Sequence, residues 1–394
     1  MVVDNLETVW SRTFCFLCLT QLLAYAHHAL LTPTLPLYMT HLGGSPFLVG
    51  LMLAAFSATS VLSRPLMGYW ADGWSVVGVL ACGAILLGLT ILLSLIPRTE
   101  VILLANALRG IAWAGFNTGG YTLLAHIAPP NRRGEASGYY SGFQTSTTVL
   151  FPALALWLID SPFGGFNTVF LISAVLALVA GSIGLAFPHP TSQTTSFSYP
   201  HAGGKQPRPG ASGFIDRGVL LPSVLFLCLT LALPAVSGFL VLYAHEVGIE
   251  NIGWYFVGGG TVSLLVRPIL GWLSDRVGRG RSVAAGFAFE VAGVLLIVVA
   301  PNLAVLVIAG IFYMVGFAIG TTTVMALAMD RADPQRRGAA MATFSMAFQI
   351  GMGSGAIIAG AVVQIAGYSG MFLTVTALVA VGLLLTAMNW RTLK

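Results

Sequence analysis

The sequence contains few charged residues: Asp, Glu, Lys and Arg make up only 8% of its 394 residues. A soluble globular chain carries about 25% charged and 45–50% apolar residues. Here 57% of the residues are hydrophobic, and the mean hydropathy is +0.88. So few charges cannot cover a water-exposed surface, which argues strongly against a soluble enzyme. The composition instead indicates a polytopic membrane protein.

Cysteine is also scarce, with four residues that all lie in apolar stretches. Cys15 and Cys18 form a single C-x-x-C, without a second pair and without a histidine at ligand spacing. We interpret these cysteines as small apolar side chains of a helix. The sequence therefore predicts no metal site, and nothing in it requires a cofactor.

Nucleotide-binding and zinc-protease motifs are absent from the chain. It contains no G-x-x-x-x-G-K-[ST], so an ATP-driven pump would need another subunit. It contains no H-E-x-x-H, and His27 and His28 are adjacent rather than four residues apart. We expect no catalytic residues and no enzyme activity.

Apolar runs long enough to cross a bilayer dominate what remains. They fall into two sets of six, near 13–39, 47–69, 76–96, 101–127, 137–159 and 166–187, then 218–245, 252–273, 282–300, 303–329, 338–364 and 369–390. Residues 188–217 are rich in Ser, Thr, Gly and Pro, which is typical of a flexible linker. The prediction is an all-α membrane protein with twelve transmembrane helices: an N-terminal six-helix half over 1–187, a cytoplasmic linker over 188–217 and a C-terminal six-helix half over 218–394.

The two sets repeat each other along the chain. RPLMGYWAD at 64–72 returns as RPILGWLSD at 267–275, and PNRRG at 130–134 returns as PQRRG at 334–338. The offsets are 203 and 204 residues. Two parallel repeats of six helices, with a site at their interface, are a recurrent plan among transporters.

Basic residues outside the spans predict the orientation of the chain in the membrane. If both termini are cytoplasmic, that side carries Arg12, Arg132, Arg133, Lys205, Arg208, Arg217, Arg276, Arg279, Arg281, Arg331, Arg336, Arg337, Arg391 and Lys394. The other side carries only Arg98. The positive-inside rule therefore predicts a multi-pass protein of the cell membrane with both termini in the cytoplasm. The same asymmetry explains the net charge of +5 without nucleic-acid binding.

The loop after the second span of each half resembles the signature of the major facilitator superfamily, G-x-L-A-D-R-x-G-R-K. The second half contains GWLSDRVGRGR at 271–281, and the first half contains the shorter match GYWADGW at 68–74. The resemblance extends over nearly the whole chain. It implies the fold of that superfamily, two six-helix halves that alternate access to a central site.

Further residues resemble the drug- and metabolite-exporting branch, such as sugar-efflux or multidrug-efflux permeases. Arg109, within LRG in the fourth span, resembles a motif of many proton-coupled members. The antiport pattern of the fifth span, G-x-x-x-G-P-x-x-G-G, keeps Pro152, but Phe151 replaces the glycine before it. The resemblance implies a secondary active transporter that exports a small organic molecule in exchange for protons.

Two alternatives remain open at this stage. One is an importer or uniporter of a small metabolite on the same fold. The other is a membrane-embedded sensor or lipid-handling protein, because a fold alone does not fix function. For each transporter hypothesis we expect a small-molecule substrate, protons and the lipid bilayer as partners, and a monomer. Arg109 together with His28 favours an anionic or zwitterionic substrate.

Charged and polar residues inside the spans are the candidates for the substrate cavity and for proton coupling, because a charge at the bilayer centre is costly. Arg109, Trp113 and Asn117 recur every four residues near the middle of the fourth span. Gln21, Tyr25 and His28 share one face of the first span. His27 points about 100° away, so we prefer His28 as the proton carrier.

Three further candidates lie elsewhere in the spans. Glu290, in the ninth span, either carries a proton or is a neutral acid bonded to a neighbouring helix. Gln144 in the fifth span and Tyr313 in the tenth either line the cavity or form ordinary interhelical hydrogen bonds.

The repeated loops also predict a conformational latch at the cytoplasmic side. We expect Gly68 and Gly271 to allow close helix approach. We expect Asp72 and Asp275 to pair with an arginine or with the N-terminus of a neighbouring helix. The arginines assigned to this latch are Arg64, Arg267, Arg276 and Arg279.

Overall fold

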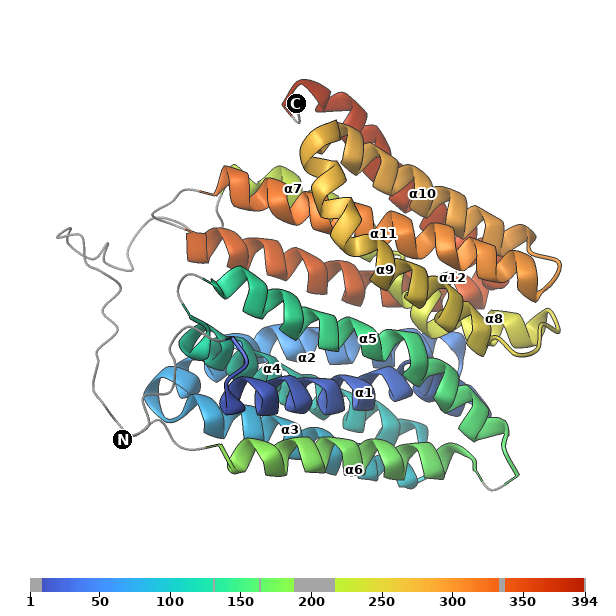
Figure 1. Ribbon diagram of the computed structural model, residues 1–394. Coiled ribbons are helices and arrows are strands. Elements are labelled where there is room, and N and C mark those ends of the chain that lie inside the picture. Colours follow the sequence, from blue (N-terminus) through green and yellow to red (C-terminus); the bar gives the residue numbers. More distant parts are fainter. Residues whose placement is uncertain (1–8, 130–131, 163, 188–216, 333–336, 393–394) are drawn as a thin grey trace, which may run out of the picture.

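The computed structural model describes residues 9–129, 132–162, 164–187, 217–332 and 337–392. Within these ranges it does not describe the side chains of residues 72, 133–134, 217, 267–275 and 337–342. All regular secondary structure in the described ranges is helical (Figure 1). The expected all-α architecture is therefore confirmed, whereas residues 188–216 of the expected linker lie outside the described part.

The helices of the first half are α1 (Arg12–His41), α2 (Pro46–Gly73), α3 (Val76–Leu92) with the short 3₁₀ helix η1 (Leu93–Leu95), α4 (Thr99–Ile127), α5 (Arg133–Asp160) and α6 (Phe166–Leu185). The second half contains η3 (Arg217–Val219), α7 (Leu220–Thr230), the π-helix η4 (Ala235–Phe239), α8 (Leu240–Glu246), α9 (Gly253–Val277), α10 (Arg279–Val299), α11 (Leu303–Arg331), α12 (Arg337–Met388) and η5 (Trp390–Thr392).

Nine helices in the described ranges are long and apolar enough to cross a membrane. α4 and α9 are not among these nine, and the described side chains of α9 before the gap form a shorter apolar helix over Gly253–Val266. α12 is interrupted at Gly367, whose φ of 69° is not helical, so this element consists of two helices. The seventh predicted span is also interrupted, because α7 ends at Thr230 and the chain continues through η4 and α8. With these two interruptions taken into account, the helices correspond to the twelve apolar segments predicted from the sequence.

Short polar residues at the loops explain where several helices begin. Ser11, Ser45 and Ser75 each accept a hydrogen bond from the backbone N–H three residues later, at 3.2, 3.3 and 3.0 Å. Asn302 does the same for α11, at 3.1 Å. Such N-caps satisfy amides that have no partner within the helix.

Glycines allow the closest helix pairs of each half. A methyl group added to Gly119 of α4 would lie 2.6 Å from the backbone nitrogen of Leu80 in α3. In the second half, a methyl group on Gly286 of α10 would lie 2.7 Å from the backbone nitrogen of Gly320 in α11. Lipid tails are as apolar as leucine, so close backbone packing of this kind holds membrane helices together. The same pair of helices is joined in both repeats.

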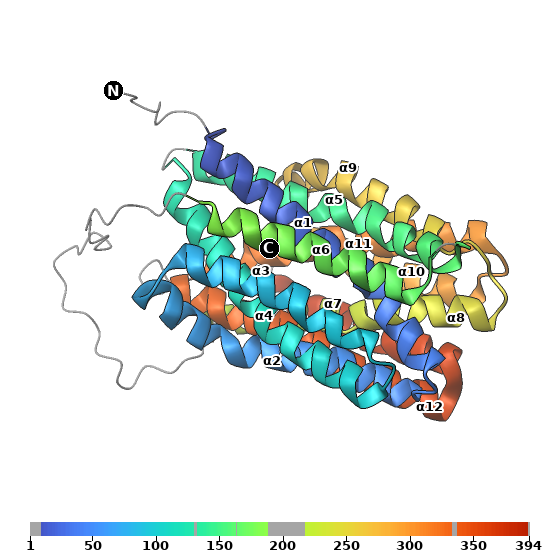
Figure 2. The ribbon, with the colours of Figure 1, turned by 90° about the horizontal axis from the view of Figure 1, so that it is seen from below.

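The two halves form separate groups of helices in Figure 1, and the view from below in Figure 2 shows the first half in front of the second. They meet mainly along two helix pairs, α2 with α12 and α5 with α9, and α1 also contacts η4 and α8. A methyl group on Gly253 of α9 would lie 3.3 Å from Ala153 of α5. A methyl group on Gly50 of α2 would collide with the backbone of Ala356 in α12. These contacts lie toward the end that carries the α1–α2 turn.

The opposite end, where α6 stops and α7 begins, is less closely packed. A methyl group added to Gly68 of α2, or to Gly138 or Gly142 of α5, meets no atom of the described residues within 4 Å. The close helix approach expected at Gly68 stays a prediction. The halves are joined at one end and parted at the other.

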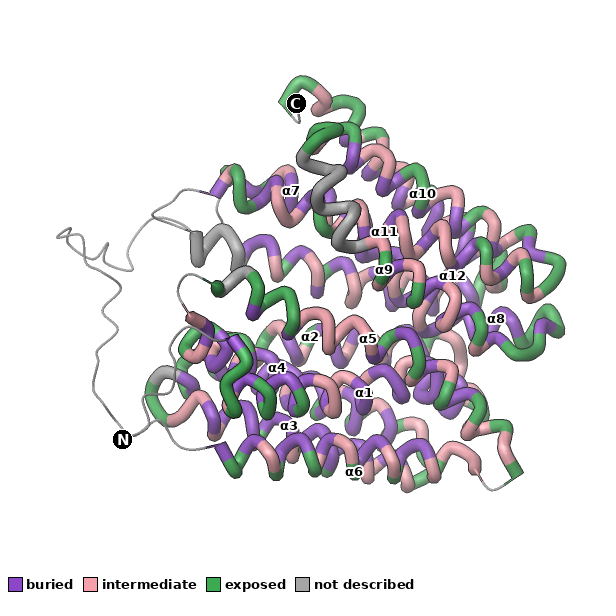
Figure 3. The backbone as a smooth tube through the Cα atoms, in the orientation of Figure 1, coloured by how far each residue is buried: buried purple, intermediate pink, exposed green. Residues whose placement is uncertain are grey.

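Buried residues lie between the helices, and exposed ones lie on the outer faces and at the ends (Figure 3). The outer faces are themselves apolar. Leu171 and Val175 of α6 and Val299 of α10 are examples of exposed apolar side chains. Such a surface is suited to contact with lipid tails rather than with water.

Candidate functional site

Arg109 is buried inside the first half. Among the described Lys and Arg side chains it alone is buried, with 4% of its surface exposed. Its Nη2 lies 3.4 Å from Nδ1 of His28, and its guanidinium carbon lies 4.8 Å from the ring centre of Phe56. Nε and Nη1 have no hydrogen-bond partner in the described part of the chain. The guanidinium thus keeps free donors in a largely aromatic setting.

The side chains predicted on α1 and α4 come together around this arginine. His28 stacks on Trp113, with ring centres 4.4 Å apart and 22° between the planes. Tyr25 packs on the same indole at 4.6 Å and donates a hydrogen bond to Oδ1 of Asn117 at 2.8 Å. The Asn117 amide in turn donates to the Trp113 carbonyl at 3.0 Å. The two helical stripes therefore form one connected cluster.

The protonation state of His28 follows from its partner. A guanidinium has donors and no acceptor, so Nδ1 of His28 must accept the hydrogen bond from Arg109. His28 is therefore neutral in this conformation, and its other ring nitrogen carries the hydrogen. The imidazole is half-buried, which leaves part of it accessible.

His27 has a different environment. Its Nδ1 lies 2.9 Å from the Ser173 hydroxyl and 3.0 Å from the Ser173 carbonyl, and the side chain is fully buried against α6. The adjacent histidines thus point to different neighbours, as their 100° separation predicts. Only His28 contacts Arg109.

No carboxylate neutralises Arg109 among the described side chains. Glu290 is the one buried acid in that set, and it belongs to the other half. The remaining described Asp and Glu side chains are all exposed. The cluster around Arg109 therefore has one uncompensated positive charge.

Gln21 and Gln144 lie at the edges of this cluster. The Gln21 side chain is fully buried, and its amide atoms have no hydrogen-bond partner among the described residues. Oε1 of Gln144 accepts a hydrogen bond from Tyr121 at 3.2 Å. Tyr121 lies four residues after Asn117 and continues the stripe of α4, so the same spacing could have identified it. Phe56 carries no polar atom, and no sequence signal pointed to it.

The residues assigned to a latch are only partly described. The side chains of Asp72, Arg267, Gly271 and Asp275 lie outside the described part. Arg64 of α2 is half-buried and lies within electrostatic range of Tyr25 and Tyr121, on the inner side of the first half. Arg276 is exposed.

Arg279 makes the one latch contact that can be followed in detail. Its Nε lies 3.4 Å from Oδ2 of Asp330, which joins the start of α10 to the end of α11. The pair lies within the second half, and both side chains are partly exposed to solvent. Asp330 was not among the predicted residues.

Glu290 and Tyr313 lie in the second half, away from the Arg109 cluster. Both side chains are fully buried on the neighbouring helices α10 and α11. Neither the carboxyl oxygens nor the tyrosine hydroxyl has a partner among the described residues.

Two parallel six-helix repeats with a buried polar cluster are a recurrent architecture of secondary transporters. The sequence profile described as Major Facilitator Superfamily matches residues 17–250 and again residues 223–392. The chain belongs to this superfamily. It is a multi-pass membrane transporter and not an enzyme.

Similar curated proteins include multidrug-resistance transporters. The quinolone resistance protein NorA of Staphylococcus aureus is 26% identical over 242 residues, and the match spans 60% of each chain. The multidrug resistance protein MdtG of Citrobacter koseri is 29% identical over 289 residues and 68% of each chain. An uncharacterised transporter of the same superfamily from Methanocaldococcus jannaschii is 22% identical over 93% of each chain.

Solved structures share the fold at low sequence identity. The nucleoside transporter NupG is 15% identical with a TM-score of 0.75, covering 97% of this chain and all of NupG. A POT family transporter in complex with 5-aminolevulinic acid is 12% identical with a TM-score of 0.80, covering 97% of each chain. A bacterial homologue of the lysosomal transporter Spinster, in an inward-facing conformation, is 15% identical with a TM-score of 0.78, covering 98% of each chain.

Proposed function

We propose that this transporter exports a small organic molecule in exchange for protons. The observation that carries the proposal is the contact between Arg109 and His28 inside a cluster of aromatic side chains. The printed names of NorA and MdtG, which are resistance proteins, support export. Intramembrane ionisable residues of this kind mark ion and substrate pathways.

Protonation of His28 supplies the coupling step. A proton on the imidazole removes the acceptor at Nδ1 and places a second positive charge 3.4 Å from the guanidinium. The two side chains then repel each other, and the imidazole leaves the face of Trp113. The second positive charge also repels a cationic substrate that would pack on the aromatic faces of Trp113 and Tyr25. Proton and substrate binding thus exclude each other, which is the requirement for exchange.

Alternating access follows from rocking of the two halves, residues 1–187 and 218–394, about the cluster. The halves touch at the end with the α1–α2 turn and are parted at the end where α7 begins. The basic residues place this second end in the cytoplasm. The conformation described here is then the one that receives substrate from the cytoplasm.

Uptake of an organic anion together with a proton is the second candidate. It is favoured by the positive charge of Arg109, which no described acid neutralises. A proton on His28 would raise the positive charge of the cluster and strengthen the binding of an anion. Proton and substrate would then bind together and move in the same direction.

The sign of the proton movement separates the two candidates. Inside-out vesicles carrying the protein and an internal pH dye are mixed with cationic drugs, organic acids or sugars, without an imposed gradient. Exchange makes the lumen more alkaline as a substrate enters, whereas co-transport makes it more acidic. Arg109→Ala and His28→Ala are expected to reduce the response at least tenfold. Cys82→Ser, on an exposed face, should leave it unchanged.

Either sign establishes proton coupling and identifies the substrate class. Labelled substrate that crosses the membrane without any change in lumen pH would overturn coupling and leave a uniporter. A response that survives both Arg109→Ala and His28→Ala would remove these residues from the mechanism.

A further inference from the structure

The second half contains a buried acid that the proposed exchange at His28 does not use. Glu290 is fully buried on α10, and both carboxyl oxygens have no hydrogen-bond partner in the described part of the chain. Its backbone is pressed against Gly316, where a methyl group would collide with the Glu290 nitrogen. The carboxyl group is therefore fixed at a tight seam between α10 and α11.

The helices packed around this seam present neutral groups to Glu290. α11 contributes Tyr313, α9 contributes Tyr255 beside Tyr313, and α7 contributes Cys228. The hydroxyls of Tyr313 and Tyr255 are buried and have no described partner. No Arg, Lys or His is among the described groups that act on the carboxyl. The described side chains of α12 include one titratable group, Tyr368, which is not among the groups that act on Glu290.

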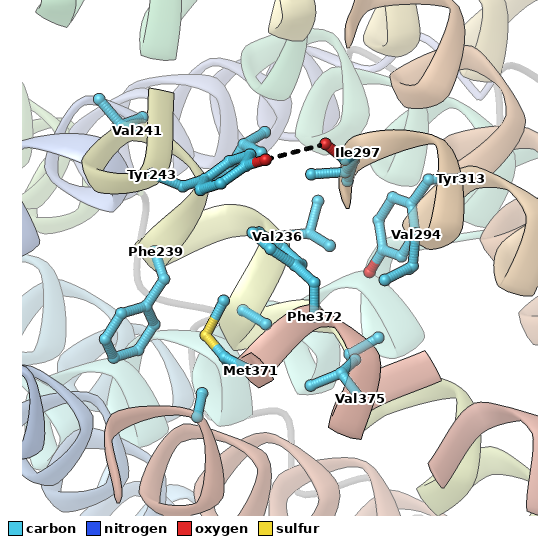
Figure 4. Close-up of a cluster of buried hydrophobic side chains, with 14 of the residues drawn as sticks. Val236, Phe239, Val241, Tyr243, Val294, Ile297, Tyr313, Met371, Phe372 and Val375 are labelled. Atoms are coloured by element: carbon cyan, nitrogen blue, oxygen red, sulfur yellow. Dashed lines mark hydrogen bonds between the residues drawn. The ribbon is translucent and has the colours of Figure 1, made fainter. Parts of the chain in front are cut away.

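The surroundings are otherwise apolar. In Figure 4 Tyr313 lies beside Val294, among buried hydrophobic side chains of α7–α12. Tyr243 in the same view differs, because its hydroxyl donates to the Ile297 carbonyl at 3.4 Å. An ionised carboxylate without a cation or hydrogen bonds is very unfavourable in such a place. Glu290 thus holds a proton in this conformation.

The helix next to Glu290 is interrupted at this level. α7 ends at Thr230, two residues after Cys228, and the chain continues through Pro234 and the π-helix η4. Pro234 lacks an N–H, so the Thr230 carbonyl loses its usual helical donor. Interrupted helices and π segments recur at ion-binding sites of membrane transporters.

The interruption also connects the acid to the other half. η4 contacts α1, and a methyl group on Gly238 within η4 would lie 2.9 Å from Leu53 of α2. On its other side, a methyl group on Gly355 of α12 would collide with the Leu231 carbonyl. Because the segment from Thr230 to Phe239 contacts both halves, a change in how the halves pack should change its conformation.

We propose that Glu290 is a proton-binding site of the second half, loaded in this conformation and emptied when the segment from Thr230 to Phe239 changes shape. The carboxyl O–H bond breaks, the proton passes to water, and a carboxylate remains until the next proton arrives. The inference rests on the proposed proton-coupled transport and adds a second proton site to it.

Glu290→Gln tests the proposal, because glutamine has the size of the protonated acid and cannot release a proton. We expect the variant to exchange labelled substrate across the vesicle membrane while the lumen pH change per substrate falls by about half, because the His28 site remains. Glu290→Asp should regain part of the pH change, since it restores a titratable group. Glu246→Gln, at an exposed acid of α8, is the matched control.

An acid that is only structural gives a different result. Glu290→Gln would then move as many protons per substrate as the unmodified protein, and the proposal would be overturned. If the unmodified protein moves no protons with any compound, the proposed function fails instead.

A second measurement does not depend on the variant folding. A hydrophobic carbodiimide reacts with protonated carboxyl groups in apolar surroundings, and mass spectrometry of peptides from the unmodified protein locates the adduct. We expect labelling of Glu290 during turnover, decreasing as the pH is raised. Absence of the adduct at Glu290 across the pH range of transport would overturn the proposal.

Discussion

Two adjacent histidines of α1 differ in almost every physical respect. His27 is fully buried and bonded to Ser173 of α6, so it joins two helices of the first half. His28 is half-buried, stacks on Trp113 and accepts from Arg109. The difference arises because successive helical residues are rotated by about 100°. Two consecutive residues therefore have different roles: His27 makes a packing contact, and His28 is a titratable group of the site.

This difference predicts opposite effects for the same substitution. His27→Ala leaves the buried Ser173 hydroxyl without its partner, which costs about 1–3 kcal/mol. We expect a lower melting temperature in detergent and an unchanged number of protons per substrate. His28→Ala should keep the melting temperature close to that of the unmodified protein and lose the proton movement. Loss of coupling in His27→Ala at normal stability would contradict this assignment.

At the scale of the secondary-structure elements, close packing of neighbouring helices determines where the polar side chains lie. α4 and α11 each contain 29 residues and start 204 positions apart, and each packs closely on the preceding helix through glycine. The repeat places Tyr313 where the first half has Arg109. The two halves thus use one helical framework to hold different polar groups. In the first half the group is a cation beside a histidine, and in the second it is a hydroxyl near a carboxylic acid.

A pair of alanine substitutions tests the seams. Alanine favours a helix over glycine by up to about 1 kcal/mol. At Gly286 its methyl group would lie 2.7 Å from the Gly320 backbone, whereas at Gly138 it meets no other atom within 4 Å. We expect Gly286→Ala to lower the melting temperature in detergent and Gly138→Ala to keep or raise it. Equal shifts at both positions would show that the α10–α11 seam is not tight.

At the scale of the whole molecule, the halves meet at one end through small residues. Such contacts bury little surface and can separate, which a rocking motion requires. Gly253 of α9 and Ala153 of α5 are close enough for a disulfide, since a methyl group at Gly253 would lie 3.3 Å from the Ala153 backbone.

Cross-linking this contact should arrest transport. In a variant with the four native cysteines replaced by serine, Ala153→Cys with Gly253→Cys is expected to form a disulfide under mild oxidation. Transport should stop in the oxidised protein and return after reduction, while each single cysteine variant stays active. Full transport by the cross-linked protein would show that this end does not open during the cycle.

Much of the site was predictable from helical spacing. Gln21, Tyr25 and His28 share a face of α1, and Arg109 belongs to a stripe of α4, so their facing sides follow from a period of 3.6 residues. Phe56 could not be found from the sequence, because an apolar residue in an apolar helix carries no signal of its own. Asp330 was missed because a polar residue at a helix end is ordinary. The break after Thr230 was missed because the apolar run of the seventh span continues through it.

The sequence by itself determined the membrane class, the positions of the spans and the repeat. Hydropathy, segment length and charge placement are properties of the chain alone and need no knowledge of how the helices pack. The tertiary structure decided which polar groups meet, that Glu290 has no hydrogen-bond partner among the described residues, and which end of the molecule is joined. These features depend on how each helix is rotated and on the angle at which helices cross. Many small packing contacts between distant residues determine both, so no local sequence pattern encodes them.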